Sequence, residues 1–346
     1  MKIGILSLAL GRNYGGILQQ YALSKYLESL GNQVVIINRQ PNSDGFLKTA
    51  MRNTLKSLGI KRYNRQPRVE PNLRDFIQRE FTVSPPVSSA RQFLNLCKKE
   101  QFDAIVYGSD QIWRREFELS CGLDYFGVST PDAVKQIAYA PSFGLDVWEY
   151  NEKETSVILD SLSRFSALSS REESGIKLIK DNLALDASLV SDPTMLLAAS
   201  HYATISSLPK IKKPYCFVYW LGDMDSMNEV IKCKTANRNL ALVSINLRSD
   251  YPLPSIEDWL SYFKNAEYVI TDSFHGTVFS LLFHKQFYIH CNKSGGFGRI
   301  ETLLTKIGAE SKLTNPEQNI DYEVVEKRIC AFRSESQSFL NDALSR

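Results

Sequence analysis

His275 is the residue of this chain best placed to do chemistry, because of the segment around it. Residues 268–270, YVI, form an apolar, β-prone run that predicts a buried strand, and residues 271–273 have the small polar side chains of turns and caps. From Thr277 onward, apolar residues recur at helical spacing. A strand, a polar turn and a helix N-terminus bind small anions in open α/β sheets. We therefore expect the imidazole to act as an acid in chemistry on a phosphate ester. The other histidines are interpreted as structural: His201, His284 and His290.

A carboxylate and an indole lie close together in GSDQIW, residues 108–113, where another predicted strand ends. Asp110 can accept a hydrogen bond from a sugar hydroxyl or deprotonate it, and Trp113 offers an apolar face to the C–H surface of a pyranose. The alternative is that Ser109 and Asp110 cap the next helix. The pattern favours a sugar site with Asp110 as a candidate base and Trp113 as an acceptor contact.

Two arginines follow probable strands or Gly-rich loops and are candidates for binding an anion. Arg171 lies in ALSSREESG and Arg299 in SGGFGRI. The guanidinium fork is the preferred partner of carboxylates and phosphates. The alternative for Arg171 is a solvated surface charge or an intrahelical pair with the neighbours of Ser174 and Gly175, and Arg299 can likewise be without a functional role. We predict that both arginines bind an anionic donor.

The first turn of the chain, LGRNYGGILQQYAL, is rich in glycine but does not match GxGxxG, and no acidic residue follows at the position that would bind a ribose. The turn therefore does not indicate a dinucleotide site. Asn13 can hydrogen-bond to a sugar and Tyr14 can stack on one. The alternative for this pair is turn chemistry with a helix cap.

The elements that must position these side chains alternate between strand and helix. Residues 3–8 predict a strand, residues 17–30 a helix that ends at Gly31, and residues 34–37 a second strand. This βαβ start implies a parallel, doubly wound sheet. Further strands are predicted at 102–107, 136–140, 167–169, 215–220, 240–245, 268–270 and 287–289.

The length of 346 residues suggests two domains at roughly 150 residues each. The fold class predicted is α/β, with two Rossmann-like domains and a central cleft. We place an N-terminal domain at residues 1–160, on the acceptor side, with a basic insertion at 41–90. A C-terminal domain follows at 161–320, on the donor side. The amphipathic segment 321–346 predicts a helix that packs back on the first domain.

Composition argues against several classes of protein. The net charge of +3 is too small to indicate nucleic-acid binding, and no apolar run is long enough for a transmembrane helix. The six cysteines show no CxxC pairing, so neither a disulfide framework nor a zinc site is indicated, and no metal is expected. The start, MKIGILSLALGR, is interpreted as a strand of a cytoplasmic protein, because its apolar run is short and lacks a cleavage site.

The stretch 48–79 is strongly basic, and its first part carries apolar residues at helical spacing. Such a helix can lie on an anionic membrane surface, at the inner face of the membrane. A solvated insertion with a core-facing stripe explains the pattern equally well. The basic residues are Lys48, Arg52, Lys56, Lys61, Arg62, Arg65, Arg68, Arg74 and Arg79.

Seven segments in this order resemble the polysaccharide pyruvyl transferase family, over residues 3–305 in total. They are NYGGILQQYALSKYLESLG, FDAIVYGSDQIW, KQIAYAPSFG, LSSREESG, VSDPTML, NAEYVITDSFHG and GFGRIETLL. Each motif is weak by itself, and their shared order makes the resemblance specific.

The resemblance implies transfer of a pyruvyl group from phosphoenolpyruvate to two hydroxyls of a sugar, which gives a cyclic ketal and phosphate. It also implies a two-domain fold similar to the GT-B glycosyltransferases, with no metal or nucleotide cofactor. His275 inherits the catalytic role as the acid, and Ser273 and Gly276 of the same motif are assigned to the donor. Many members carry an arginine, in an S-R-L-H pattern, where this chain has Phe274. The charge of the donor must then be met by other cations, which increases the importance of the two arginines.

The acceptor that the resemblance implies is galactose, joined through O4 and O6, in a surface-polysaccharide precursor. A lipid-linked oligosaccharide would suit the basic stretch. Two other functions stay open at the level of the sequence. One is a glycosyltransferase of the same fold that uses a sugar nucleotide. The other is a non-catalytic sugar-binding or scaffold protein of the same pathway.

Overall fold

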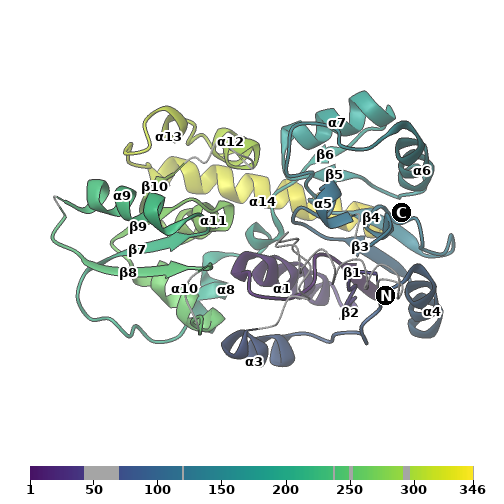
Figure 1. Ribbon diagram of the computed structural model, residues 1–346, viewed down its shortest axis with the longest axis horizontal. Coiled ribbons are helices and arrows are strands. Elements are labelled where there is room, and N and C mark those ends of the chain that lie inside the picture. The colour runs from purple at the N-terminus through teal and green to yellow at the C-terminus, as the bar shows by residue number, and fades with distance from the viewer. Residues whose placement is uncertain (43–69, 119–120, 237, 249–251, 291–296, 346) are drawn as a thin grey trace, which may run out of the picture.

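The computed structural model describes residues 1–42, 70–118, 121–236, 238–248, 252–290 and 297–345, which form two α/β lobes (Figure 1). The first lobe contains a parallel sheet in the order β2-β1-β3-β4. Its strands are almost entirely buried, as expected for a sheet covered by helices on both faces. They are β1 (Lys2–Leu6), β2 (Gln33–Ile36), β3 (Ala104–Tyr107) and β4 (Lys135–Ala138).

The first lobe continues past residue 160. Two short parallel strands, β5 (Ser169–Ser170) and β6 (Ser188–Leu189), follow the sheet, and Ala167 forms a parallel bridge with Ile137 of β4. β5 and β6 form a separate two-stranded sheet beside the first one, and the domain boundary at residue 160 stays a prediction. The helices of this lobe are α1 (Tyr14–Ser29), α3 (Pro71–Glu80), α4 (Ala90–Glu100), α5 (Arg115–Glu118), α6 (Glu152–Leu162) and α7 (Glu173–Leu183). Two 3-10 turns complete the chain up to the second lobe: η1 (Asp124–Phe126) precedes β4, and η2 (Pro193–Met195) follows β6.

The second lobe repeats the architecture with a parallel sheet in the order β10-β9-β7-β8. Every residue of its central strand β7 is buried. Its strands are β7 (Tyr215–Trp220), β8 (Ala241–Asn246), β9 (Tyr268–Thr271) and β10 (Gln286–Ile289). Its helices are α8 (Ala199–Ile205), α9 (Met224–Thr235), α10 (Ile256–Asn265), α11 (Phe274–Leu282), α12 (Phe297–Lys306) and α13 (Ser311–Thr314).

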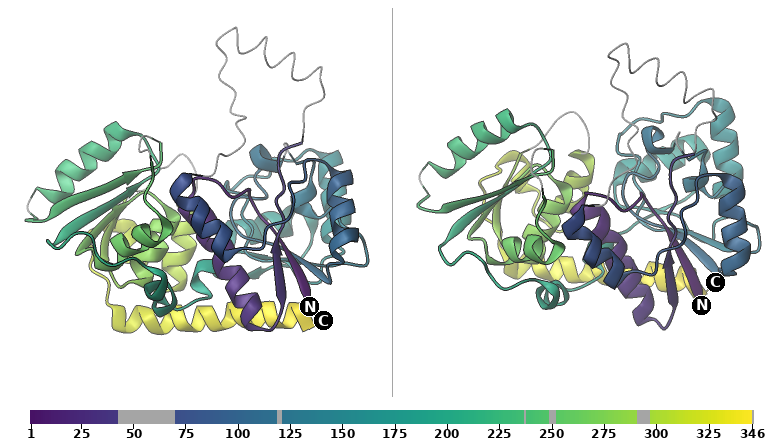
Figure 2. Two further views of the ribbon diagram at one scale, coloured as in Figure 1. Left: turned by 90° about the horizontal axis from the view of Figure 1, so that it is seen from below. Right: turned by 60° about the horizontal axis from the view of Figure 1, so that its bottom comes forward.

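Helix α14 (Tyr322–Ser345) runs beneath both lobes, as the left view of Figure 2 shows. Its C-terminal half contacts the first lobe, where the Tyr26 hydroxyl donates to Asn341 at 3.0 Å. The Ser336 hydroxyl accepts from the amide of Ser191, in the connector between the lobes, at 2.8 Å. Earlier in the helix, Glu335 pairs with Lys306 of α12 at 2.8 Å. One continuous helix is thus bonded to both lobes and to their connector.

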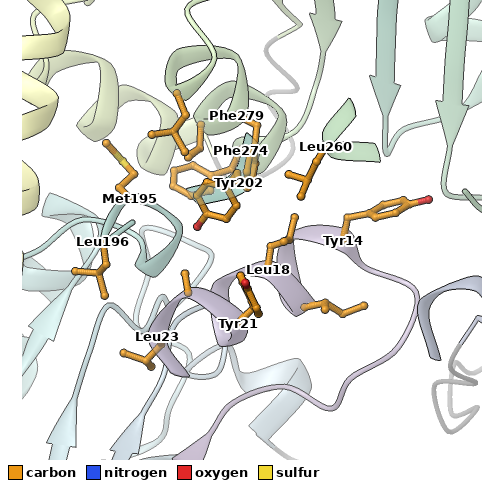
Figure 3. Close-up of a cluster of buried hydrophobic side chains, with 14 of the residues drawn as sticks. Tyr14, Leu18, Tyr21, Leu23, Met195, Leu196, Tyr202, Leu260, Phe274 and Phe279 are labelled. Atoms are coloured by element: carbon orange, nitrogen blue, oxygen red, sulfur yellow. The ribbon is translucent and has the colours of Figure 1, made fainter. Parts of the chain in front are cut away.

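The lobes share a continuous apolar core at the level of α1 (Figure 3). Tyr14, Leu18 and Tyr21 of α1 face side chains of the second lobe, among them Leu260 and Phe279. This core fixes α1 of the first lobe against α10 and α11 of the second. It thereby fixes the two helix N-termini that flank the cleft.

The sequence predictions for the two Rossmann-like lobes are confirmed, and each predicted strand overlaps an observed one. Most of the basic stretch 48–79 lies outside the described residues. Its described end belongs to α3, whose Leu73 and Phe76 are buried in the core while Arg79 pairs with Glu257 at 2.7 Å. Within the described ranges, no helix combines the length and apolar character needed to cross a membrane.

Candidate active site

His275 is held in the first turn of α11 by the residues around it. The Ser273 hydroxyl caps the helix by accepting from the amide of Gly276 at 3.3 Å, and the Thr271 hydroxyl accepts from the Ser273 amide at 3.1 Å. A Cβ on Gly276 would lie 2.2 Å from that Thr271 oxygen, so only glycine fits there. Ser273 lines the cleft, whereas Gly276 is explained by packing alone.

The imidazole of His275 crosses from the second lobe to the N-terminus of α1 in the first. A Cβ on Gly15 would lie only 2.0 Å from His275 Nδ1 and 2.2 Å from Cγ. The glycine at this position is therefore what allows the ring to approach α1. Gly15 belongs to the glycine-rich first turn, but the partner that needs the space is 260 residues away in the chain.

The two lobes enclose a cleft of about 340 Å³ between the N-termini of α1 and α11. Both lobes contribute polar and charged side chains to it, and its apolar surface comes from Leu221, Phe274, Phe297 and Ile300. The polar lining residues are Asn13, Asp110, Gln111, Arg248, Asp272, Ser273, His275, His290 and Arg299.

Behind the cleft, a buried carboxylate joins the two lobes electrostatically. Asp192 Oδ2 lies 3.7 Å from His275 Nε2 and accepts a hydrogen bond from Arg171 Nη1 at 2.7 Å. The Ser109 hydroxyl donates to the same oxygen at 2.9 Å, and Thr194 donates to Oδ1 through its amide and hydroxyl. Burial opposes ionisation of Asp192, but the charges of His275 and Arg171 outweigh it and hold the pKa of this carboxyl well below its usual range.

Asp110 lies at the edge of the cleft in an unusual backbone conformation. Its φ is +80°, in the left-handed region that side chains other than glycine rarely occupy. A parallel bridge with Pro141 and a bond from Arg171 Nη2 to Oδ1 at 3.3 Å hold it there. Such strained positions cluster at functional sites, where they fix a side chain against its own preference. The carboxylate is thus presented to the cleft by the backbone and by Arg171.

Arg171 and Arg299, predicted as a pair, have different positions. The side chain of Arg171 is fully buried and does not line the cleft, because Asp192 and Asp110 occupy both ends of its guanidinium. We correct its predicted role from donor binding to support of these carboxylates. Arg299 does line the cleft, and among the described residues its Nε has no hydrogen-bond acceptor, the nearest carboxylate oxygen of Glu172 being 3.9 Å away.

Phe274 lies between these two arginines. Its ring centroid is 4.8 Å from the guanidinium carbon of Arg171 and 5.9 Å from that of Arg299. Burial, and then the charge of Arg171, lower the pKa of Arg299 from its ordinary value. The aromatic face stabilises both cations. The residue that departs from the S-R-L-H pattern therefore supports the cations of this chain.

Two predicted acceptor contacts are wrong. Trp113 is fully buried, stacks on Phe126 at 5.3 Å and donates its Nε1–H to the carbonyl of Tyr125 at 3.0 Å, so its faces are already covered. Tyr14 is also fully buried, and its ring stacks on Trp259 of the second lobe at 5.2 Å. Both side chains build the core. Asn13, in contrast, lines the cleft, and its contact with an acceptor sugar stays a prediction.

Three polar residues of the site were not predicted from the sequence. Asp192 lies in the VSDPTML segment quoted for the family resemblance, but no role was assigned to it. Asp272 directly follows β9 and accepts from the amides of Leu221 and Gly222, each at 2.7 Å, while burial raises its pKa. His290 follows β10 and lines the cleft, so its interpretation as structural was incomplete. All three residues come shortly after a strand, and this position is the feature of the sequence that could have identified them.

In the described part of the chain, no group of three or more His, Cys, Asp or Glu side chains is arranged to hold a metal ion. The arrangement instead combines a carboxylate, an imidazole and a guanidinium at the helix N-termini. It can bind an anion, donate a proton and accept one.

Solved structures with a similar fold define the class of the protein. Spinosyn forosaminyltransferase SpnP is 11% identical, with a TM-score of 0.50 and coverage of 100% of both chains. Arabidopsis thaliana UGT89C1, complexed with UDP-L-rhamnose, is 10% identical, with a TM-score of 0.51 and coverage of 99% of this chain and 98% of that one. The chain thus has the two-domain GT-B fold. None of the curated proteins compared with it matches.

The model of the polysaccharide pyruvyl transferase family matches residues 13–289, and the chain belongs to that family. The predicted resemblance is confirmed. Its class of activity is accordingly pyruvyl transfer in polysaccharide biosynthesis.

Proposed function

We propose that the protein transfers the pyruvyl group of phosphoenolpyruvate to two hydroxyls of a sugar, galactose being the expected one, and releases phosphate. The observation that carries the proposal is the cleft itself. His275, Asp110 and Arg299 come from three separate segments of the chain and line one cavity of about 340 Å³. They are the acid, the base and the cation that this reaction needs.

The donor is an anion with a carboxylate and a phosphate. Arg299 lines the cleft with an Nε that lacks an acceptor among the described residues, and Arg248 lines the same cleft. The N-terminus of α11 adds backbone amides with a favourable dipole. Because Arg171 is committed to Asp192 and Asp110, Arg299 is the principal donor-binding side chain in this proposal.

The reaction begins with transfer of a proton from the His275 imidazolium to the methylene carbon of the donor. The C=C π electrons form the new C–H bond, and an oxocarbenium-like centre develops at C2. A sugar hydroxyl attacks C2 while Asp110 accepts its proton. The C2–O bond to phosphate then breaks, and the phosphate leaves with the proton held by Asp110.

The second sugar hydroxyl attacks the oxocarbenium ion that remains and closes the ring. Its proton goes to the now neutral imidazole of His275, which regenerates the acid. Two hydroxyl protons are thus lost, one proton is gained by the new methyl group and one leaves with phosphate. Both side chains return to their starting states.

Phosphate release from phosphoenolpyruvate with a panel of galactosides and glucosides tests the proposal. We expect sugar-dependent release by the wild-type protein and a loss of about 10²- to 10⁴-fold in the His275→Ala variant, the usual size of general-acid catalysis. His284→Ala is the matched control, because His284 lies half exposed on the surface beside Glu326. Equal losses in the two variants, or no binding of phosphoenolpyruvate by calorimetry, would reject the proposal.

The acceptor we propose is a lipid-linked oligosaccharide, met at the cytoplasmic face of a membrane. The support is the charge of the stretch 48–79, most of which lies outside the described residues. Flotation with anionic vesicles that carry the acceptor lipid tests this part separately. A protein that stays at the bottom of the gradient would exclude membrane contact and leave the transfer reaction untouched.

A further inference from the structure

Asp192 is a buried charge of the site that the reaction described above does not use. Its side chain has no solvent exposure, and it lies in the connector that follows β6. Every hydrogen bond to it comes from the first lobe or the connector: from Arg171, Ser109 and Thr194. The carboxylate is therefore fixed independently of α11, which carries His275.

The imidazole of His275 meets this fixed carboxylate with one edge. Nε2 is buried, lies 3.7 Å from Asp192 Oδ2 and has no hydrogen-bond partner among the described residues. Nδ1, on the other side of the ring, lies against the backbone of Gly15, where a Cβ would come within 2.0 Å of it. The two nitrogens are thus in different surroundings: Nε2 is beside a buried negative charge, and Nδ1 is on the edge of the ring next to the N-terminus of α1, where the cleft lies.

We propose, on the basis of the function proposed above, that Asp192 is a positioning residue that orients the imidazole of His275 through Nε2 and stabilises its positive charge. Nδ1 is then the nitrogen that delivers the proton to the donor and later takes one back. A carboxylate on one nitrogen of a histidine fixes which nitrogen reacts.

Other charged groups also surround the imidazole. Asp192 is distinguished from them because, in the part of the chain that is described, no other carboxylate forms an ion pair with His275. The remaining groups are Asp110, Arg171, Arg248, Asp272, His290 and Arg299. Replacing Asp192 by asparagine keeps the shape of the side chain, removes its charge and turns one of its two acceptor oxygens into a donor.

The test is NMR of the His275 imidazole in isotope-labelled protein without substrates, assigned by comparison with His275→Ala. In wild type we expect the neutral ring to carry its proton on Nε2. In Asp192→Asn we expect the midpoint of the His275 titration to fall by about one to three pH units, the usual effect of one charge at this distance. The alkaline limb of the kcat–pH profile should fall with it.

Two further variants make the test independent of folding. Asp124→Asn removes a different buried ion pair, Asp124 with Arg39 at 2.7 Å, and should leave the His275 titration unchanged. Ser109→Ala removes one donor to Asp192 Oδ2 and leaves the charge, so the midpoint should rise by a few tenths of a pH unit. This variant decides the question if Asp192→Asn does not fold.

A neutral His275 ring protonated on Nδ1 would overturn the inference. An unchanged midpoint of the His275 titration in Asp192→Asn would also overturn it. If Asp192→Asn does not fold, an unchanged midpoint in Ser109→Ala would do the same. Because the NMR measurement uses no donor or acceptor, its result stands apart from the proposed reaction. If the titration shifts are observed but the protein does not turn over phosphoenolpyruvate, the proposed role of Asp192 stands and only the proposed substrate is rejected.

Discussion

Gly15 provides the sharpest test of the site, because a single methyl group there would collide with the imidazole of His275. A Cβ would lie 2.0 Å from Nδ1, and ordinary van der Waals contact begins at 3.4 Å, so the ring must move by about 1.4 Å. A displacement of about 1 Å at a reacting group can cost about 10²-fold in rate. We therefore expect Gly15→Ala to lower kcat for phosphate release about 100-fold.

The neighbouring glycine is a matched control in the same helix. A Cβ on Gly16 would have Asn13 Cβ as its nearest neighbour, at 3.5 Å, which is an ordinary contact. Gly16→Ala should keep kcat within about twofold of wild type and gain up to about 1 kcal/mol in the free energy of unfolding from helix propensity. Gly15→Ala should instead lose about 1 to 3 kcal/mol through overpacking.

A double-mutant cycle decides whether the collision is the cause. In the His275→Ala background the imidazole is gone, so the loss of stability on Gly15→Ala should disappear, and urea titration of the four proteins measures this coupling. The reasoning is refuted if Gly15→Ala alone turns over within about threefold of wild type. It is also refuted if its destabilisation persists without the imidazole.

Three other substitutions test separate features. Burial lowers the pKa of Lys312 to about 8, so above that pH the unfolded state binds one more proton than the folded state. The free energy of unfolding of wild type relative to Lys312→Met should therefore rise by up to about 3 kcal/mol from pH 8 to pH 10.5. A difference that stays constant with pH in urea titrations would contradict this. Phe274→Leu removes the ring beside Arg171 and Arg299, which loses about 1 to 2 kcal/mol of cation–π interaction. Steady-state kinetics should therefore show a KM for phosphoenolpyruvate that is about 5- to 30-fold higher. Trp113→Phe leaves the buried carbonyl of Tyr125 without its donor and should lower the free energy of unfolding by about 1 to 3 kcal/mol. The KM for the acceptor should be unchanged. A higher acceptor KM would support the original prediction that Trp113 contacts the sugar.

The sequence predicted the fold well because its signals are local. Short apolar runs that end in polar turns, with helical spacing between them, place strands and helices without any knowledge of tertiary contacts. The same logic places residues at the carboxyl ends of parallel strands, which is why His275 and Asp110 were found, whereas Arg299 was found through the Gly-rich loop that precedes it. All three line the observed cleft.

The errors concern where a side chain points and which distant partner it meets. Tyr14 and Asn13 are adjacent in the chain, yet Asn13 lines the cleft and Tyr14 packs on Trp259, because the rotation of α1 is set by the other lobe. The sequence gives no sign that Arg171 is paired, because its partners Asp192 and Asp110 come from two other segments of the chain. Strand β5 has only two residues, too few for a periodic signal, so its bounds could not be predicted accurately from the sequence.

The continuous helix α14 has a consequence for the order in which the molecule is built. Both sheets are translated before α14, yet the connector and the first lobe complete their hydrogen bonds only with Ser336 and Asn341 of that helix. On the ribosome, each sheet and the apolar core that α1 shares with α10 and α11 can form before α14 is complete. A nascent chain that stops before residue 336 would lack the hydrogen bonds of Ser336 and Asn341, so the connector and the first lobe gain these bonds only at the end of synthesis.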